Sequence, residues 1–208
     1  MKILMIGDYS NLHAYLAAEL KLRGHEVTLV SNKGDYMKTE ADIELRRKPR
    51  MWGSIGYVYR ILSLLPSFAG YDVVQLINPS IMFLKCNKLR IVYDILKKNN
   101  KSVFLTLCGD DHFFVKDCAE SDLFRFSEYR IGKEKTEYVR QIPLNESVAL
   151  SAQFANYTSH VYDTIDGAMS VLPEYDMSAR RHMDPDKILF TKLPVNLDSL
   201  KFEELDLN

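Results

Sequence analysis

Residues 1–31, MKILMIGDYSNLHAYLAAELKLRGHEVTLVS, hold two short apolar runs separated by a pattern of a different period. The runs MKILMIGD and EVTLVS have the length and residue types of buried strands. Between them Leu12, Leu16 and Leu20 recur every four residues, the spacing of one helix face. Gly24 follows, where a helix end favours a left-handed residue. The order strand, helix, strand predicts two parallel strands in one buried sheet.

The same alternation returns further along the chain. Residues 80–100 have the apolar spacing of a helix, and further helices are expected near 145–165 and in EYDMSARRH. Six strands alternating with helices predict an α/β fold, a doubly wound, mostly parallel Rossmann-like sheet with helices on both faces. The remaining predicted strands are 71–79, 102–109, 166–173 and 188–195.

Two insertions interrupt this alternation. Residues 33–70 contain the basic run RRKPR and then IGYVYRILSLLPSF, which has the pattern of an amphipathic helix. Residues 111–145 are rich in charged and aromatic side chains. Irregular insertions at the ends of parallel strands usually carry the substrate contacts of an α/β protein.

The composition excludes several classes of protein. The chain is 47% hydrophobic with a formal net charge of -1, so nothing at the level of the whole chain indicates nucleic acid or a membrane span. The N-terminal apolar run is too short for a signal peptide, and we expect a cytoplasmic protein. Cys86, Cys108 and Cys118 lack metal-ligand spacing, which predicts reduced thiols and no metal site.

Three loops follow predicted strands: residues 7–11, 78–80 and 108–112. They are therefore expected at one edge of the sheet, where open α/β folds bind ligands. The first of them contains Gly7 alone, without the glycines of a dinucleotide fingerprint, and Asp8 stands where a phosphate would lie. An ordinary turn, with Ser10 or Asn11 capping the helix, is the favoured interpretation. His13 is expected either to face the same rim or to point into solvent.

The stretch LTLCGDDHF, residues 105–113, passes abruptly from an apolar strand into a polar cluster. Carboxylates and an imidazole at Asp110, Asp111 and His112 could serve as a general base or hydrogen-bond a polyol. The alternative is that the carboxylates cap the next helix. Cys108 has no partner base in the sequence, which favours a buried, inert thiol over a nucleophile.

The segment RRKPRMW admits two interpretations. It is either a basic and aromatic surface that contacts anionic lipid headgroups or an acidic acceptor, or a solvated charged loop. Under the first interpretation the protein contacts the inner face of the membrane peripherally, through Arg46, Arg47, Lys48, Arg50 and Trp52.

The motifs, taken in order, resemble the N-terminal domain of GT-B glycosyltransferases of the group 1 family. YDVVQLINP resembles the family's DVVHxHxP, VFLTLCGDD its VVxTxHGxD, DGAMSVLP its ADxVxxVS and LPVNLDSLKF its xPNGVDxxxF; the strand-helix start and RGHEVT also match. Two positions depart from the pattern: Cys108 stands where the family often has histidine, and Asn196 where it usually has glycine.

The resemblance implies transfer of a sugar, with retention, from a nucleotide-sugar donor to a glycan or lipid-linked acceptor. Residues 1–195 would form the acceptor-binding domain and 196–208 the linker to a C-terminal domain that binds the donor, without a metal or other cofactor and with no nucleic acid as partner. The fragment alone would be inactive. Asp110, Asp111 and His112 are the catalytic candidates, and the predicted acceptor contacts are Asp8, Tyr9, Ser10, Asn11, His13, Asn78, Ser80, Cys108 and Gly109.

Two other classes stay open. A stand-alone Rossmann-like or flavodoxin-like binding module would bind a ligand without transfer chemistry. An oxidoreductase is disfavoured, because the glycine fingerprint of nicotinamide-binding domains is absent.

Overall fold

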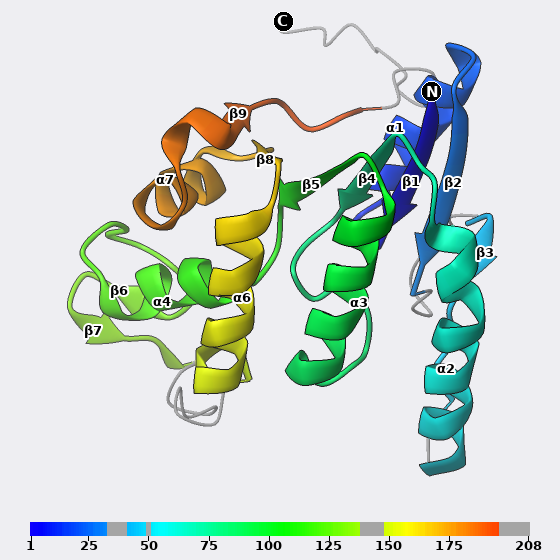
Figure 1. The fold of residues 1–208 in the computed structure, drawn as a ribbon. Helices are drawn as coiled ribbons and strands as arrows, with labels where there is room; N and C mark the ends of the chain where they lie inside the picture. The colour runs from blue at the N-terminus through cyan, green and yellow to red at the C-terminus, as the bar shows by residue number, and fades with distance from the viewer. Residues whose placement is uncertain (33–40, 49–50, 138–147, 196–208) are drawn as a thin grey trace, which may run out of the picture.

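A computed structural model describes residues 1–32, 41–48, 51–137 and 148–195. Its centre is a seven-stranded sheet of order β3-β2-β1-β4-β5-β8-β9, in which every neighbouring pair is parallel (Figure 1). This confirms the predicted Rossmann-like α/β fold. The strands are β1 (Lys2–Ile6), β2 (Glu26–Ser31), β3 (Ile43–Glu44), β4 (Val73–Leu76), β5 (Ser102–Leu107), β8 (Gly167–Ser170) and β9 (Ile188–Phe190).

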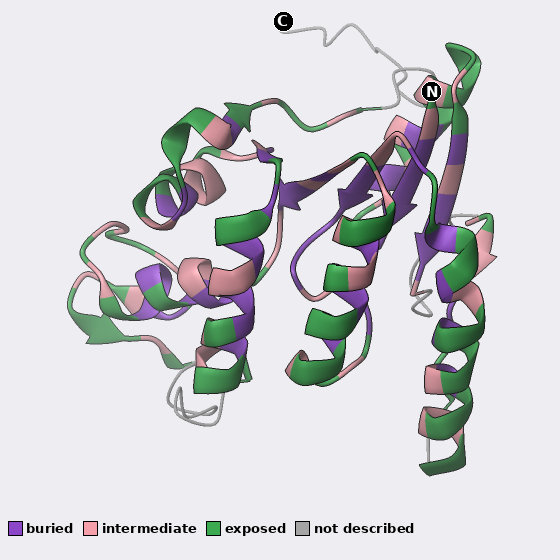
Figure 2. Ribbon diagram, viewed as in Figure 1, coloured by how far each residue is buried: buried purple, intermediate pink, exposed green. Residues whose placement is uncertain are grey.

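Successive residues of the strands supply two separate cores, because side chains alternate between the faces of a sheet. Ile3 and Met5 of β1 pack in a small cluster with α1. Leu4 and Ile6 belong to the main core, which the other helices share (Figure 2 shows the buried strands). These helices are α2 (Met51–Leu64), α3 (Cys86–Asn99), α6 (Ala152–Thr164) and α7 (Pro173–His182). Helix α4 (His112–Glu120) packs against α6 and α7. Helix α1 (Leu12–Leu22) lies on the opposite face of the sheet.

Helix α1 ends as the sequence predicts. Gly24 has a φ of 82°, and its amide donates to the carbonyl of Lys21 while the His25 amide donates to that of Leu20. These two hydrogen bonds form a Schellman motif, which satisfies carbonyls that the last helical turn leaves without partners.

The structure adds strands that the sequence analysis missed. β3 is a seventh strand of the main sheet but has only two residues, too few for an alternating pattern. The insertion at 111–145 contains α4 and a hairpin of β6 (Arg130–Ile131) and β7 (Glu134–Lys135). The predicted linker, 196–208, lies outside the described residues.

The strand order reverses between β1 and β4, and the loop after β1 fits closely at this point. Gly7 has a φ of 85°, and a Cβ atom there would lie 2.2 Å from Cγ2 of Ile77. Only glycine combines this backbone conformation with this separation. The close fit brings the end of β1 against the segment that follows β4.

We predict that Gly7→Ala lowers the free energy of unfolding by roughly 2–5 kcal/mol, because left-handed strain adds to the overlap with Ile77. Gly24→Ala is the matched control: its φ is 82°, but no atom lies within 4 Å of the new Cβ. The control should lose only about 1–2 kcal/mol. Urea unfolding measures both, and equal losses would contradict the close fit.

Candidate functional site

The loops after β1, β4 and β5 lie together at the carboxyl edge of the sheet. The Asn78 amide donates to the carbonyl oxygens of Cys108, at 2.9 Å, and Asp110, at 3.4 Å. The Tyr9 ring lies over Gly109, where a Cβ would approach Cε2 of the ring to 2.9 Å. The structure therefore brings together the three loops that the sequence singled out.

Asn78 joins these loops from inside the protein. Its side chain is fully buried, and its Oδ1 accepts a hydrogen bond from the Ser80 amide at 2.8 Å. The amide group of Asn78 is thus already bonded to backbone on two loops, while Ser80 is half-buried. Asn78 holds the site in shape and is screened from a ligand.

Asp8 occupies the N-terminus of α1. Its Oδ1 accepts a hydrogen bond from the His13 amide at 2.9 Å, and the residue is 7% exposed. Asn11 is the N-cap residue but makes no cap hydrogen bond with its side chain, so Asp8 supplies the cap expected of Ser10 or Asn11. A carboxylate in this position complements the helix dipole and takes the place where dinucleotide folds bind pyrophosphate.

His13 is a correction to both expectations, since it neither faces the rim nor points into solvent. Its ring is fully buried, with Nδ1 2.7 Å from the Gly7 carbonyl oxygen and Nε2 3.1 Å from Oγ1 of Thr106. A carbonyl only accepts, so Nδ1 carries the proton and Nε2 accepts from Thr106. Gln75 Nε2 in turn donates to Thr106 at 2.7 Å. This chain of hydrogen bonds links the first loop to β5 and β4.

Burial lowers the pKa of His13 to about 4 from its ordinary 6.5, although the bond to Gly7 opposes the shift. Between these pH values the unfolded chain binds a proton that the folded chain does not. We predict that the free energy of unfolding falls by about 3 kcal/mol from this residue as the pH drops from 6.5 to 4.

His13→Gln provides the comparison, because glutamine does not titrate. Urea unfolding of both proteins should show the stability advantage of the wild type over the His13→Gln variant shrinking as the pH is lowered through this interval. A difference that stays constant from pH 6.5 to 4 would contradict the buried neutral imidazole.

Asp111 and His112 also point inward. Asp111 caps α4 by accepting from the Phe114 amide at 2.9 Å, and its second oxygen accepts from the Tyr162 hydroxyl at 2.6 Å. Burial raises the pKa of Asp111. His112 is 8% exposed and its Nδ1 is 2.8 Å from the Ala149 carbonyl oxygen. The helix-cap alternative is confirmed for Asp111, and both side chains hold the loop to its neighbours.

Asp110, in contrast, is exposed. Partial desolvation raises its pKa, and the nearby carboxylates of Glu128 and Asp111 add to the shift, against a hydrogen bond from Tyr129. Cys108 beside it is half-buried; burial, with the charge of Asp8, raises the pKa of the thiol to about 11. The thiol is therefore protonated at neutral pH. It is half-buried where the sequence analysis expected a buried thiol, and its inertness stays a prediction.

Tyr175 of α7 joins this edge and was missed by the sequence analysis. Its ring packs in the same cluster as Tyr9 and Cys108, and its hydroxyl bonds with the Gly109 backbone. Burial raises the pKa of Tyr9 to about 12, so its phenol is neutral. The sequence did contain a signal for Tyr175: α7 begins directly after β8, so its first turn must lie at the carboxyl edge of the sheet with the three loops. We call Tyr9, Cys108, Gly109, Asp110 and Tyr175 the lip.

The described residues set further limits on the chemistry. Among them no group of three or more histidine, cysteine, aspartate or glutamate side chains is placed to hold a metal ion. Within the same ranges, no helix is both long enough and apolar enough to cross a bilayer. The lip offers one exposed carboxylate, two neutral phenols and a protonated thiol, a set suited to hydrogen bonding.

Comparisons with known proteins do not identify a family. No family model matches the chain, and no curated protein matches it. Among solved structures, the chain is similar to the 3-alpha-hydroxysteroid dehydrogenase from Pseudomonas sp. B-0831 complexed with NADH, at 12% identity and a TM-score of 0.43, over 92% of this chain and 95% of that one. So remote a likeness carries no argument about function. The strand order defines the class: this is a Rossmann-like α/β protein.

Proposed function

We propose that the lip binds an uncharged, hydroxyl-rich ligand, and that the domain is the acceptor-binding half of a glycosyltransferase. One observation carries this proposal. The exposed carboxylate of Asp110 lies close to Tyr9 and Tyr175 on an edge whose helix N-terminus is already filled by Asp8.

A sugar suits these groups. A carboxylate accepts hydrogen bonds from two neighbouring hydroxyls, and a phenol can both donate and accept. The aromatic rings of Tyr9 and Tyr175 supply apolar surface for the C–H face of a pyranose, while Asp110 fixes its orientation. Ligand sites of this kind combine apolar walls with a few well-placed polar groups.

The acidic groups around the lip disfavour a phosphate ligand. Asp8, Asp110 and Glu128 are all near it, and a pyrophosphate would be repelled by them. A nucleotide-sugar donor therefore needs other residues for its diphosphate, as the resemblance to the group 1 family implies. The acceptor hydroxyl would then be held about 3 Å from the anomeric carbon when the two halves close together.

In that reaction the hydroxyl oxygen forms the new bond to the anomeric carbon, the bond from that carbon to the diphosphate oxygen breaks, and the hydroxyl proton leaves with the diphosphate. Asp110 would orient the hydroxyl by accepting its hydrogen bond. Cys108, Asp111 and His112 would support the loop that carries Asp110, since their side chains are buried or half-buried.

The alternative is a stand-alone Rossmann-like module that binds the same ligand without transferring it. This coarser interpretation needs no more than the Rossmann-like fold, so it rests on fewer assumptions than the transferase does. The lip would be the ligand site in both cases. The sequence encoded downstream separates the two. A further domain of about 150–200 residues favours the transferase if it contains E-x7-E, the element with which the group 1 family contacts the phosphate and ribose of the donor.

Binding to an array of neutral oligosaccharides tests the lip. The wild-type chain should bind at least one glycan, and Asp110→Asn should weaken that binding about tenfold or more, because a hydrogen bond to a charged group is lost. Asp163→Asn is the matched control, an exposed carboxylate in the last turn of α6 at the opposite edge of the sheet. It should bind as wild type does.

Calorimetric titration with NADH completes this test. We expect no binding, because Asp8 fills the N-terminus of α1. Tight NADH binding together with an empty glycan array would overturn the proposal in favour of a nucleotide-binding module.

A further inference from the structure

Helix α2 exposes a continuous apolar stripe. Met51, Trp52, Ile55, Tyr59 and Leu62 are 54–77% exposed. At 100° per residue, these five positions fall within an arc of about 100° on the helix surface. The opposite side of the helix, with Tyr57 and Ile61, is buried in the main core. One face of α2 is thus used for folding and a second apolar face remains exposed.

The position of α2 leaves this stripe accessible. Helix α2 lies at one side of the molecule, the side on which β2 and β3 form the outer edge of the sheet (Figure 1). Much of its length is exposed (Figure 2). Isolated exposed apolar residues are ordinary, but a contiguous patch marks an interaction surface.

In the part of the chain that the structure describes, the charged side chains placed beside the stripe are basic. Residues 51–64 contain no aspartate or glutamate and one arginine, Arg60. Lys88 of α3 lines the shallow hollow formed by all the stripe residues except Trp52. The Arg47 guanidinium donates to the Ser54 hydroxyl at 2.9 Å, which holds its charge beside the helix. Arg46 is paired with Glu44, and Arg50 lies outside the described residues.

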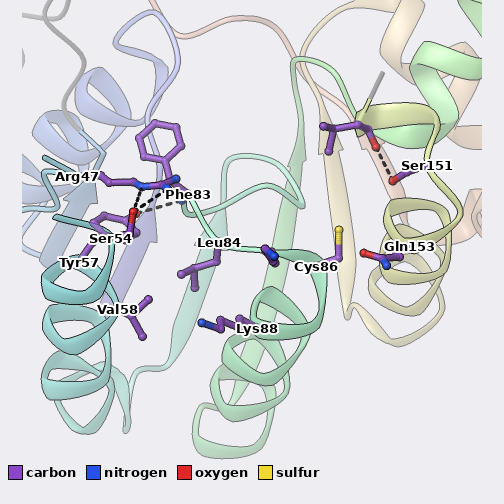
Figure 3. Close-up of a pocket in the computed structure, with 12 residues that line it drawn as sticks. Arg47, Ser54, Tyr57, Val58, Phe83, Leu84, Cys86, Lys88, Ser151 and Gln153 are labelled. Carbon is purple, nitrogen blue, oxygen red and sulfur yellow. Dashed lines mark hydrogen bonds between the residues drawn. The ribbon is translucent and has the colours of Figure 1, made fainter. Parts of the chain in front are cut away.

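A groove of about 860 Å³ opens between α2 and α3 and shares Ser54, Val58 and Lys88 with that hollow. Figure 3 shows Arg47, Ser54, Tyr57 and Val58 on one side of it, Lys88 of α3 near its middle, and Ser151 and Gln153 on the other side. Its walls are mainly apolar, with Arg47, Lys85 and Lys88 as the cations. Apolar walls with basic groups match the chemistry of an anionic amphiphile.

We propose that the stripe of α2 docks on an anionic lipid bilayer, with the apolar side chains entering the boundary between headgroups and acyl chains and the cations binding lipid phosphates. A helix with aromatic and aliphatic residues on one face and basic residues beside it has the properties of an interfacial anchor. Charge complementarity selects this occupant, since the cations nearest the stripe face no acidic residue of α2. This surface is separate from the lip, so either proposal can fail alone.

Trp52 is the only tryptophan of the chain, which makes its fluorescence a direct probe of the stripe. With vesicles of phosphatidylcholine and phosphatidylglycerol, we expect a blue shift of Trp52 emission, quenching by brominated acyl chains, and co-sedimentation of the protein. Vesicles of phosphatidylcholine alone should bind much less. About 0.5 M NaCl should reverse most of the binding, because it screens the cations.

Two pairs of variants separate the contributions. The double variant Ile55→Gln, Tyr59→Ser should abolish co-sedimentation, while Leu22→Gln, a control with an 84% exposed leucine at the end of α1, should not. Lys88→Gln should weaken binding about fivefold, in keeping with one headgroup contact. Lys133→Gln, an exposed lysine of the β6–β7 turn, should leave it unchanged.

Three results would overturn the proposal. The first is equal binding to neutral and anionic vesicles, or no binding to either. The second is a Trp52 blue shift that grows with protein concentration without lipid, accompanied by a doubled mass in light scattering, because the stripe would then pair with a second copy. The third is unchanged vesicle binding by the Ile55→Gln, Tyr59→Ser variant.

Discussion

The series of buried hydrogen bonds from Gly7 through His13 and Thr106 to Gln75 is the interaction on which the carboxyl edge of the sheet depends. It crosses the point where the strand order reverses and ties the first loop to β4 and β5. Because burial keeps the His13 ring neutral, one ring nitrogen donates a hydrogen bond and the other accepts one. Every hydrogen bond in the series therefore has a defined donor and acceptor. These hydrogen bonds therefore hold the first loop to β4 and β5 within the fold itself.

The placement of Asp8 follows from the same local structure and decides what the edge can bind. Its bond to the His13 amide closes the N-terminus of α1, the feature that lets many Rossmann-like domains bind phosphate. An acidic lip with exposed Asp110 is left at the carboxyl edge of the sheet, while basic groups gather beside α2. The segment after β4 contributes to both places, through the buried Asn78, which bonds to the Cys108 carbonyl of the lip, and through Lys85 in the groove.

Much of the fold could be predicted from the sequence, because parallel strands and their helices have distinct periods and strand ends share an edge. The convergence of the loops at Tyr9, Asn78 and Gly109 follows from that rule alone. The direction in which each polar side chain points does not follow from that rule. Asp111 and His112 turn inward because an adjacent helix end and a backbone carbonyl need partners, and only tertiary packing supplies those. β3 was missed because two residues carry no periodic signal, and Tyr175 because the loop after β8 was not among the three considered.

The central claim is that this edge of the sheet binds uncharged hydroxyl-rich ligands and excludes dinucleotides. Amide NMR spectra recorded during titration with the glycan selected on the array, and separately with NADH, test it most directly. The account predicts glycan-induced shifts concentrated at Tyr9, Gly109 and Asp110, with no change on adding NADH. Shifts at the N-terminus of α1 on adding NADH, and none at these positions with the glycan, would contradict it.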